Sequence, residues 1–354
     1  MKLGVIFGSS SSEHEVSIVS GYNVVNNLDK KKYDVTKIYL DKNNNWFVCE
    51  DLKVEKFGNL PKSIKPIKNV FEFLKSFDCI FPVMHGKLGE DGSIQGLLEV
   101  LNVPYVGCNI LASSLCMDKI YTKAILKNGA SVSLDLTIIK DGKDIYYYDN
   151  LVPIKKVNYK EINKLIVEKL DYPVFIKPSR AGSSVGVSKV KTFKELKPSL
   201  EEALKHDNKV LIEKCIVGRE LECAVLCGNA LSVGEVLSAD EFYDYDAKYQ
   251  NEASKTEVPA NISKIVEKEI KDASEYAFKA LACKGLARVD FFLEDKTNKL
   301  IINEINTMPG FTDISMYPML AKNAGISYKK LLDILIKDAI KNRWWRKYES
   351  KKNN

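Results

Sequence analysis

The chain has 354 residues, too many for one small core and enough for two or three domains. Hydrophobic residues make up 45% and charged residues 28%, and no apolar run approaches the roughly 18 residues that a membrane helix needs. The net charge of +6 lies partly in residues 341–354, without the long basic stripe typical of nucleic-acid binding. We therefore expect a cytoplasmic globular protein that binds neither nucleic acid nor a membrane.

The first hundred residues alternate strand-like and helix-like segments. The segment KLGVIFG is strand-like and ends at a glycine loop, whereas a signal peptide has a longer apolar region. The pattern predicts strands at 2–8, 33–41, 77–86 and 103–107, and helices at 13–29 and 93–102. Such alternation indicates a parallel α/β layer, with a first domain boundary between 107 and 115.

The remaining chain mixes helices with antiparallel patterns. Helices are expected at 117–129, 161–170, 263–283 and 327–345, and strands at 172–179 and 211–218. Residues 140–162 suggest strand and loop, and residues 240–257 a polar, aromatic loop. Hairpins are expected around CGNA (227–230) and at 285–306.

Eight cysteines are scattered along the chain without a CxxC pair. Cys223 and Cys227 are four residues apart, and only three histidines are present. Buried free thiols are therefore favoured over a zinc site.

The first glycine loop, GSSSSEHE (8–15), joins a predicted strand to a predicted helix. It has neither the GxGxxG spacing of a dinucleotide fold nor the GK[ST] of a P-loop. It is either a structural turn or a helix N-terminus that offers backbone N–H groups to an anion. Glu13 would repel an anion and suits an ammonium group better.

The second loop, in IKPSRAGSSVGV (176–187), follows an apolar strand that ends in Lys177. A lysine in that place must be paired or belong to a site. The loop adds a cation, hydroxyls and glycines that permit close backbone approach, which predicts a flexible cover over phosphates. The alternative is a polar surface hairpin.

A predicted hairpin joins GLARVDFFLED (285–295) to KLIINEINTMPG (299–310). If it turns near Thr297, Asp290 lies opposite Glu304 and Arg288 lies opposite Asn306. All four polar groups then share one face. Carboxylate and amide oxygens suit Mg²⁺ beside substrate phosphates, and a surface salt-bridge ladder is the alternative. A register slip of one residue would break the arrangement.

The segment NTMPGF (306–311) follows the second strand of this hairpin directly. The Pro–Gly pair predicts a tight turn, whose Gly310 N–H could serve as an oxyanion donor.

Seven motifs in this order resemble the D-alanine–D-alanine ligase family of the ATP-grasp superfamily, and they span nearly the whole chain. They are EHEVS (13–17), HGKLGEDGSIQGLLE (85–99), MDK (117–119), KPSRAGSSVGVSKV (177–190), YDYDAKY (243–249), ARVDFF (287–292) and EINTMPGFTDISMYP (304–318).

The resemblance implies an α/β (α+β) ATP-grasp fold with an N-terminal parallel α/β domain. The expected domains are an N-terminal substrate-binding domain, a central ATP-grasp subdomain, and a C-terminal ATP-grasp subdomain with the metal hairpin and a lid loop, at 1–110, 111–216 and 217–354. It also implies a homodimer that makes D-alanyl-D-alanine for peptidoglycan through an acylphosphate, using ATP and two Mg²⁺ or Mn²⁺. D-Ala–D-Ser or D-Ala–D-Lac ligation is the near alternative, and a non-catalytic nucleotide-binding module the distant one.

The same resemblance assigns the ATP site residue by residue. The metal ligands would be Asp290, Glu304 and Asn306. The phosphates would be contacted by Lys119, Lys177, Ser184 and Lys248. The nucleoside would be contacted by Glu213, Lys214 and Glu220, although Glu220 could be a plain edge-strand acid.

The substrate site is assigned in the same way. Glu13 would bind the first ammonium group, and Ser183 and Tyr249 would bond with Glu13 and close the 240–257 loop. The tetrahedral oxyanion would be stabilised by Arg288 and Gly310, and the second carboxylate held by Ser315 and Met316. His85 would lie near the second substrate or be a structural loop histidine.

Two positions bear on departures from the family. Relatives often carry a second glycine where this chain reads GSSSSE, a departure that should be harmless if the backbone there stays out of positive φ. Variant ligases differ at the lid tyrosine or near SMYP. Here Tyr249 is present and Met316 is not arginine, which favours D-alanine as second substrate.

Overall fold

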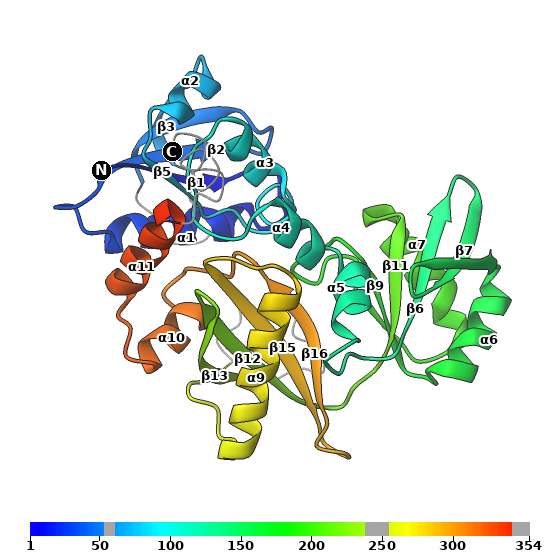
Figure 1. Ribbon diagram of the computed structural model, residues 1–354. Helices are drawn as coiled ribbons and strands as arrows, with labels where there is room; N and C mark the ends of the chain where they lie inside the picture. Colours follow the sequence, from blue (N-terminus) through cyan, green and yellow to red (C-terminus); the bar gives the residue numbers. More distant parts are fainter. Residues whose placement is uncertain (53–60, 238–254, 342–354) are drawn as a thin grey trace, which may run out of the picture.

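The computed structural model describes residues 1–52, 61–237 and 255–341. Its described strands form three sheets, drawn in blue, in green, and in olive to orange in Figure 1. No helix within these ranges is long and apolar enough to cross a membrane. The mixed α/β architecture agrees with the predicted fold class.

The N-terminal sheet has the strand order β4-β3-β2-β1-β5. Its parallel strands are β1 (Lys2–Gly8), β2 (Asp34–Leu40) and β5 (Cys79–Pro82), and its antiparallel edge is β3 (Trp46–Asp51) and β4 (Lys62–Pro66). The helices are α1 (His14–Asn27), α2 (Val70–Lys75) and α3 (Ser93–Val100). The parallel layer is confirmed, although the predicted strand at 103–107 is only an isolated bridge between Ile80 and Tyr105.

The central sheet has the order β10-β9-β11-β6-β7-β8 and is antiparallel. Its strands are β6 (Asp135–Asp141), β7 (Asp144–Asp149), β8 (Val152–Lys156), β9 (Val174–Pro178), β10 (Ser188–Val190) and β11 (Lys209–Lys214). Helices α6 (Tyr159–Lys169) and α7 (Phe193–His206) pack on it. Helix α7 was not predicted: it contains Pro198, which lacks an N–H, but buried Leu196 and Leu200 hold it to the sheet.

The C-terminal sheet has the order β14-β13-β12-β15-β16. Its strands are β12 (Gly218–Leu226), β13 (Asn229–Leu237), β14 (Lys255–Glu257), β15 (Leu286–Glu294) and β16 (Leu300–Asn306). The predicted β12–β13 hairpin turns at Cys227 and Gly228, whose φ angles of 49° and 87° match the tight turn of a two-residue hairpin. Helices α9 (Lys264–Ala280) and α10 (Met316–Asn323) pack on this sheet.

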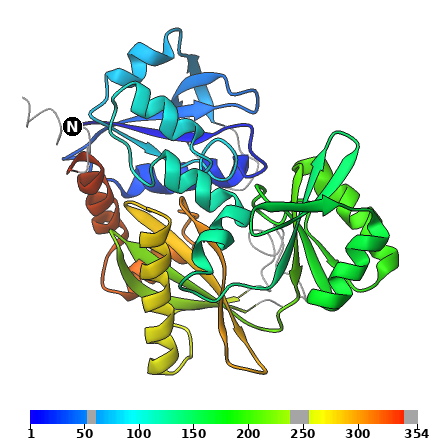
Figure 2. The same cartoon turned by 45° about the vertical axis from the view of Figure 1, so that its right-hand side comes forward.

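Two short helices, α4 (Ile110–Met117) and α5 (Lys119–Leu126), join the N-terminal sheet to the central one (Figure 2). The last described helix, α11 (Tyr328–Lys341), returns to pack against α1 and β5 (Figure 1). The N-terminal sheet therefore shares one apolar core with the C-terminal helices, while the central sheet has a core of its own.

All eight cysteines are free thiols. Six are buried, as predicted, but Cys227 is exposed because it lies in the β12–β13 turn.

Candidate active site

The β15–β16 hairpin has the predicted register. Arg288 pairs with Asn306 and Asp290 with Glu304, and the register shifts by one residue only beyond Asp290. The opposite face, with Ala287, Val289, Phe291 and Ile305, is buried in the core. The alternation of strand side chains therefore brings the four polar groups to one face.

Arg288 joins the acids of this face into one network. Its Nε and Nη2 each donate to Asp290 at 2.7 Å, and Nε lies 3.0 Å from Glu222 Oε2 on β12. Asn306 Nδ2 donates to Asp290 Oδ2 at 3.0 Å. Burial alone would lower the pKa of Arg288, but Asp290 and Glu222 hold it well above its ordinary value. Arg288 does pair with acids, as the alternative of a salt-bridge ladder required, but these side chains are largely buried. The alternative of a ladder on the surface is therefore wrong.

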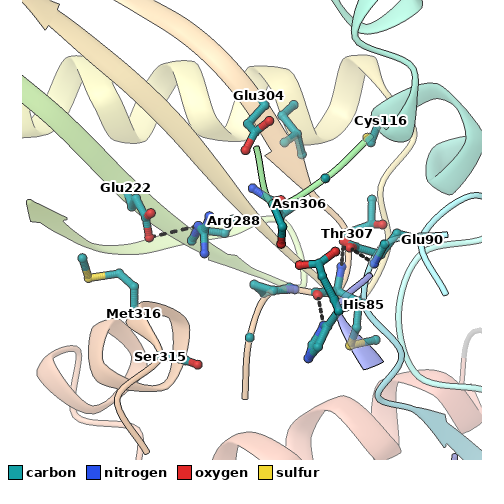
Figure 3. Close-up of a pocket in the computed structure, with 18 of the residues that line it drawn as sticks. His85, Glu90, Cys116, Glu222, Arg288, Glu304, Asn306, Thr307, Ser315 and Met316 are labelled. Atoms are coloured by element: carbon teal, nitrogen blue, oxygen red, sulfur yellow. Dashed lines mark hydrogen bonds and ion pairs between the residues drawn. The ribbon is translucent and has the colours of Figure 1, made fainter. Parts of the chain in front are cut away.

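Two adjoining spaces meet at this hairpin. The small cavity, of about 100 Å³, lies among the N-terminal loops, the hairpin and the start of α10 (Figure 3). The large cleft, of about 620 Å³, lies between the central and C-terminal sheets. Lys119, Ser183 and Glu304 line both, so a ligand in the cleft can meet one in the cavity.

A buried ion network forms the wall of the large cleft. Lys177 Nζ lies 2.6 Å from Glu213 Oε2, and Lys123 also pairs with Glu213. Burial alone would raise the pKa of Glu213, but the two ammonium groups outweigh it and lower that pKa. Burial alone would lower the pKa of Lys177, yet Glu213 raises it. The cleft therefore presents a charged lysine beside an ionised carboxylate.

The loop of residues 180–187 joins β9 to β10, and its tip lines both spaces. Lys119 Nζ donates to Ala181 O at 2.9 Å, and Arg180 pairs with Asp207 at 2.6 Å. Ser183 and Ser184 have positive φ angles of 50° and 58°. The segment is therefore a hairpin, as the alternative prediction had it, but its tip lines the candidate site and does not lie on the outer surface.

Glu13 lies where the first glycine loop meets the segment around Gly86 and the 180–187 loop. A Cβ added to Gly86 or Gly182 would come within 2.5 or 3.0 Å of Glu13 Oε2. Glu13 is the N-cap residue of α1, but its side chain makes no capping hydrogen bond. Its carboxylate faces the small cavity.

The first loop has a residue with positive φ where this chain departs from its relatives. Ser9 has a φ of 92°, a backbone conformation that favours glycine, so the condition stated for that position fails. Its N–H donates to Leu40 O at 2.9 Å, and the His14 ring Nδ1 lies 2.6 Å from Ser9 O. These contacts hold Ser9 in the strained conformation.

The segment after β16 enters the small cavity as an extended chain bent at 307–308, without the predicted tight Pro–Gly turn. Met308 N–H donates to Glu90 Oε1 at 2.9 Å, and His85 Nδ1 lies 2.9 Å from Met308 O. Burial, together with the nearby Glu13, raises the pKa of Glu90 to about 8. Gly310 lines the cavity, as predicted for an oxyanion donor.

The predicted site residues within the described ranges all line one or both spaces. Those at the small cavity are Glu13, His85, Lys119, Ser183, Arg288, Glu304, Asn306, Gly310, Ser315 and Met316. Those reached only from the large cleft are Lys177, Ser184, Glu213, Lys214, Glu220 and Asp290. Lys248 and Tyr249 lie outside the described residues. The individual roles stay predictions.

Sequence reasoning missed Glu90, Glu222 and Lys123. Glu90 stands inside the motif HGKLGEDGSIQGLLE, and strand alternation places Glu222 on the face of Glu220. Lys123 follows Lys119 by four residues, so the two share a face of α5. These signals were present, but no rule singles out one acid or lysine among many.

The donor set of the hairpin fits a magnesium ion. Within 1–52, 61–237 and 255–341, no group of three His, Cys, Asp or Glu side chains has the geometry of a metal site. Asp290 and Glu304 now face cations: Arg288 bonds Asp290, and Lys119 Nζ lies 3.5 Å from Glu304 Oε2. Two carboxylates and an amide match an ion that completes its shell with phosphate and water oxygens.

A lysine-lined cleft between two sheets, beside a hairpin face that carries two carboxylates, fits the class of ATP-dependent ligases with the ATP-grasp fold. Two family models match this chain: "D-ala D-ala ligase N-terminus" over residues 2–108 and "D-ala D-ala ligase C-terminus" over 142–337. The chain belongs to the D-alanine–D-alanine ligase family.

Individual relatives agree with this membership. The chain is 44% identical to D-alanine–D-alanine ligase B of Clostridium tetani, over 97% of this chain and 94% of the relative. The solved VanG D-Ala:D-Ser ligase of Enterococcus faecalis is 36% identical with a TM-score of 0.80, covering 96% of this chain and 99% of that one. The Bacillus anthracis D-alanine–D-alanine ligase solved with ATP is 32% identical with a TM-score of 0.75, covering 98% and 99%.

Proposed function

We propose that the chain joins two D-alanines into D-alanyl-D-alanine for peptidoglycan synthesis, converting ATP to ADP and phosphate. The observation that carries the proposal is the register of β15 and β16, which puts Arg288, Asp290, Glu304 and Asn306 between the small cavity and the large cleft. ATP in the cleft would then point its last phosphate at an amino acid in the cavity.

The reaction has two steps. The carboxylate of the first D-alanine attacks the γ-phosphorus of ATP, which gives an acylphosphate and ADP. The amine of the second D-alanine then attacks the acyl carbon and loses a proton, and phosphate leaves as the peptide bond forms. A carboxylate is a poor acyl donor because oxide cannot leave, whereas phosphate can. Positioning and charge neutralisation would supply most of the catalysis.

The nucleotide would lie in the large cleft. Lys119 and Lys177 would meet the phosphates under the 180–187 loop, where Ser184 adds a hydroxyl. Glu213, Lys214 and Glu220 would contact the adenosine, as the family motifs suggest. Lys177 is already charged and held in place by Glu213, which supports a role as a fixed phosphate ligand.

Asp290, Glu304 and Asn306 would hold two Mg²⁺ or Mn²⁺ ions. When bound, such ions neutralise the charge of the transferred phosphate. Arg288 and Lys119, which now neutralise Asp290 and Glu304, would then be released toward the reacting oxygens.

The two amino acids would occupy the small cavity. Glu13 would bind the first ammonium group, and Arg288 with Gly310 N–H would stabilise the tetrahedral oxyanion. Ser315 is the N-cap residue of α10, and its side chain bonds Thr312 instead of capping the helix. The first N–H groups of α10 at Met316 therefore suit the second carboxylate.

Some features of the proposal rest on the family motifs alone. Lys248 would contact the ATP phosphates, and Tyr249 would bond with Glu13 and close the 240–257 loop together with Ser183. The chain would be a cytoplasmic homodimer, divided into domains near residues 110 and 216. Sedimentation of the pure protein tests the homodimer, and limited proteolysis tests the domain boundaries.

A second candidate is D-Ala–D-Ser ligation. It is favoured by one observation, the likeness to the VanG D-Ala:D-Ser ligase at a TM-score of 0.80. Met316, which lines the small cavity near the proposed second carboxylate, is a position where a specificity difference would act.

The test is phosphate release from ATP and Mg²⁺ with D-alanine, compared with L-alanine and with D-alanine plus D-serine or D-lactate. Each product is identified by mass. D-alanyl-D-alanine as main product supports the first proposal, and a mixed product moves the chain to the second. ATP binding without release in any mixture would overturn both.

A further inference from the structure

We propose that Glu90, His85 and Ser20 together are positioning residues that hold the segment Met308–Phe311, so that the Gly310 N–H points at the developing oxyanion. We call these three residues the clamp. The inference rests on the proposed function, and it assigns to the N-terminal domain a part in the chemistry beyond substrate binding.

The clamp bonds both backbone polar groups of Met308 and the N–H of Phe311. Glu90 Oε1 accepts the Met308 N–H at 2.9 Å, and His85 Nδ1 lies 2.9 Å from Met308 O (Figure 3). Ser20 Oγ accepts the Phe311 N–H at 3.2 Å. Three hydrogen bonds from the N-terminal domain therefore flank Gly310 on both sides.

The hydrogen bonds of His85 fix its tautomer. Met308 O can only accept, so Nδ1 carries the proton and donates. Nε2, 2.8 Å from Ser20 Oγ, must then accept the Ser20 hydroxyl proton, which leaves the Ser20 oxygen free to accept from Phe311. Burial lowers the pKa of His85, in keeping with this neutral ring. Both ring nitrogens are thus occupied within the protein, so His85 acts through the segment it holds.

Glu90 also reaches toward the first substrate. Its second oxygen, Oε2, accepts the Gly86 N–H at 2.8 Å. Gly86 has a φ of 67°, and a Cβ there would come within 2.5 Å of Glu13 Oε2. One carboxyl group therefore ties the residue beside the proposed ammonium site to the segment that carries the proposed oxyanion donor.

The segment itself has the properties of a held donor. Met308 and Phe311 are buried, at 3% and 0% exposure, while Gly310 lines the small cavity. Among the described residues, the Gly310 N–H has no acceptor. A donor aimed at a charge that develops only in the transition state affects kcat more than substrate binding.

The experiment measures kcat, the KM for ATP and amide hydrogen exchange over 308–311 for wild type, Glu90→Gln, Ser20→Ala and the double variant. Glu90→Gln keeps the shape but puts an NH₂ donor against one backbone N–H. We expect each single variant to lower kcat about tenfold, with the KM for ATP within about twofold, because a small misplacement of a reacting group is costly. Exchange at Met308 and Phe311 should rise, and the double variant should lose less than the product of the two single losses.

The matched control is Glu99→Gln, which removes a carboxylate bonded to Tyr105 outside the site and should leave kcat and exchange unchanged. Unchanged exchange in both single variants would overturn the clamp. Faster exchange with wild-type kcat would overturn its role in the chemistry. Absence of turnover in wild type with D-alanine would instead overturn the proposed function, and the exchange rates would still decide whether the clamp holds the segment.

Discussion

The β15–β16 hairpin and the 180–187 loop face each other across the candidate site, and they place their side chains by different means. In the hairpin, register and strand alternation put Arg288, Asp290, Glu304 and Asn306 on one face, and the register shifts only between Asp290 and Phe291. In the loop, Ser183 and Ser184 adopt positive φ, and the Arg180–Asp207 pair anchors one end. Strand pairing holds the hairpin, whereas side-chain contacts anchor the loop.

The sharpest test of the hairpin is Asp290→Asn. Replacing a carboxylate ligand by an amide at a fixed register position should leave the fold intact and lower Mg²⁺-dependent phosphate release by about a thousandfold or more. Asp295→Asn, the same change at the exposed turn residue that follows β15, is the control and should keep full activity. Activity of Asp290→Asn near the wild-type level would contradict the proposal that the hairpin binds the metal ions.

The cleft beneath the loop is tested by Lys177→Ala. Loss of this charge leaves Lys123 as the remaining cation paired with Glu213 and would remove the proposed phosphate contact, so the KM for ATP should rise by about ten- to a hundredfold. Steady-state kinetics at varied ATP measure the effect, with exposed Lys194→Ala on α7 as control. An equal change in both variants would argue against a specific contact.

The anchor of the loop is tested by the pH dependence of Asp207→Asn. Burial would raise the pKa of Asp207, but Arg180 and backbone N–H groups lower it below its ordinary 3.8. A lowered pKa means that the carboxylate stabilises the fold above pH 3.8 and loses this effect as pH falls through the lowered value. The variant should unfold about 1–2 kcal/mol more easily at pH 7, and the difference should shrink as the pH falls below 3.8 through the lowered pKa of Asp207.

Thermal unfolding of wild type and Asp207→Asn between pH 2 and 7 measures that difference. A gap that stays constant over the range would show that the anchor acts by shape and not by charge.

Backbone strain is tested at the first glycine loop, where Ser9→Gly should remove the cost of a φ of 92°. We expect the free energy of unfolding to rise by about 1 kcal/mol, because glycine adopts this conformation without steric conflict. Ser12→Gly, at an exposed position with negative φ, should instead lower it slightly. Denaturant unfolding compares the two, and a stabilising Ser12→Gly would discount the argument from strain.

Sequence reasoning succeeded where a period of two or of 3.6 residues fixes the outcome. The hairpin register followed from counting back from a turn near Thr297, and the N-terminal parallel layer followed from strand–helix alternation. It missed strands β3 and β4, which have no clean alternation, and the Pro-containing α7. Strand β4 is exposed throughout and is held by pairing with β3, whereas buried Leu196 and Leu200 hold α7 to its sheet. Neither the pairing nor the burial can be read from the local pattern.

In the candidate site, too, local pattern predicts some features and not others. Glycine loops and strand acids can be read from composition and spacing, so the predicted positions within the described ranges gathered at the two spaces. The His85–Met308 and Glu90–Met308 bonds join residues 223 and 218 positions apart, which no local pattern reveals. The positive φ of Ser9 depends on its contacts with Leu40 and His14, which likewise are visible only in the fold.

The return of α11 to the first sheet has a consequence for synthesis. Leu331, Leu332, Leu335 and Ile336 of α11 fill the core that also contains Leu3 and Phe7, so the first strand made shares its interior with the last described helix. On the ribosome, this sheet would expose part of its apolar face until α11 has been made, while the central sheet, with a core of its own, can fold earlier. Pulse proteolysis of stalled nascent chains would reveal this order as protection of residues 135–214 before residues 2–82. Completion of the first sheet is therefore tied to the synthesis of α11.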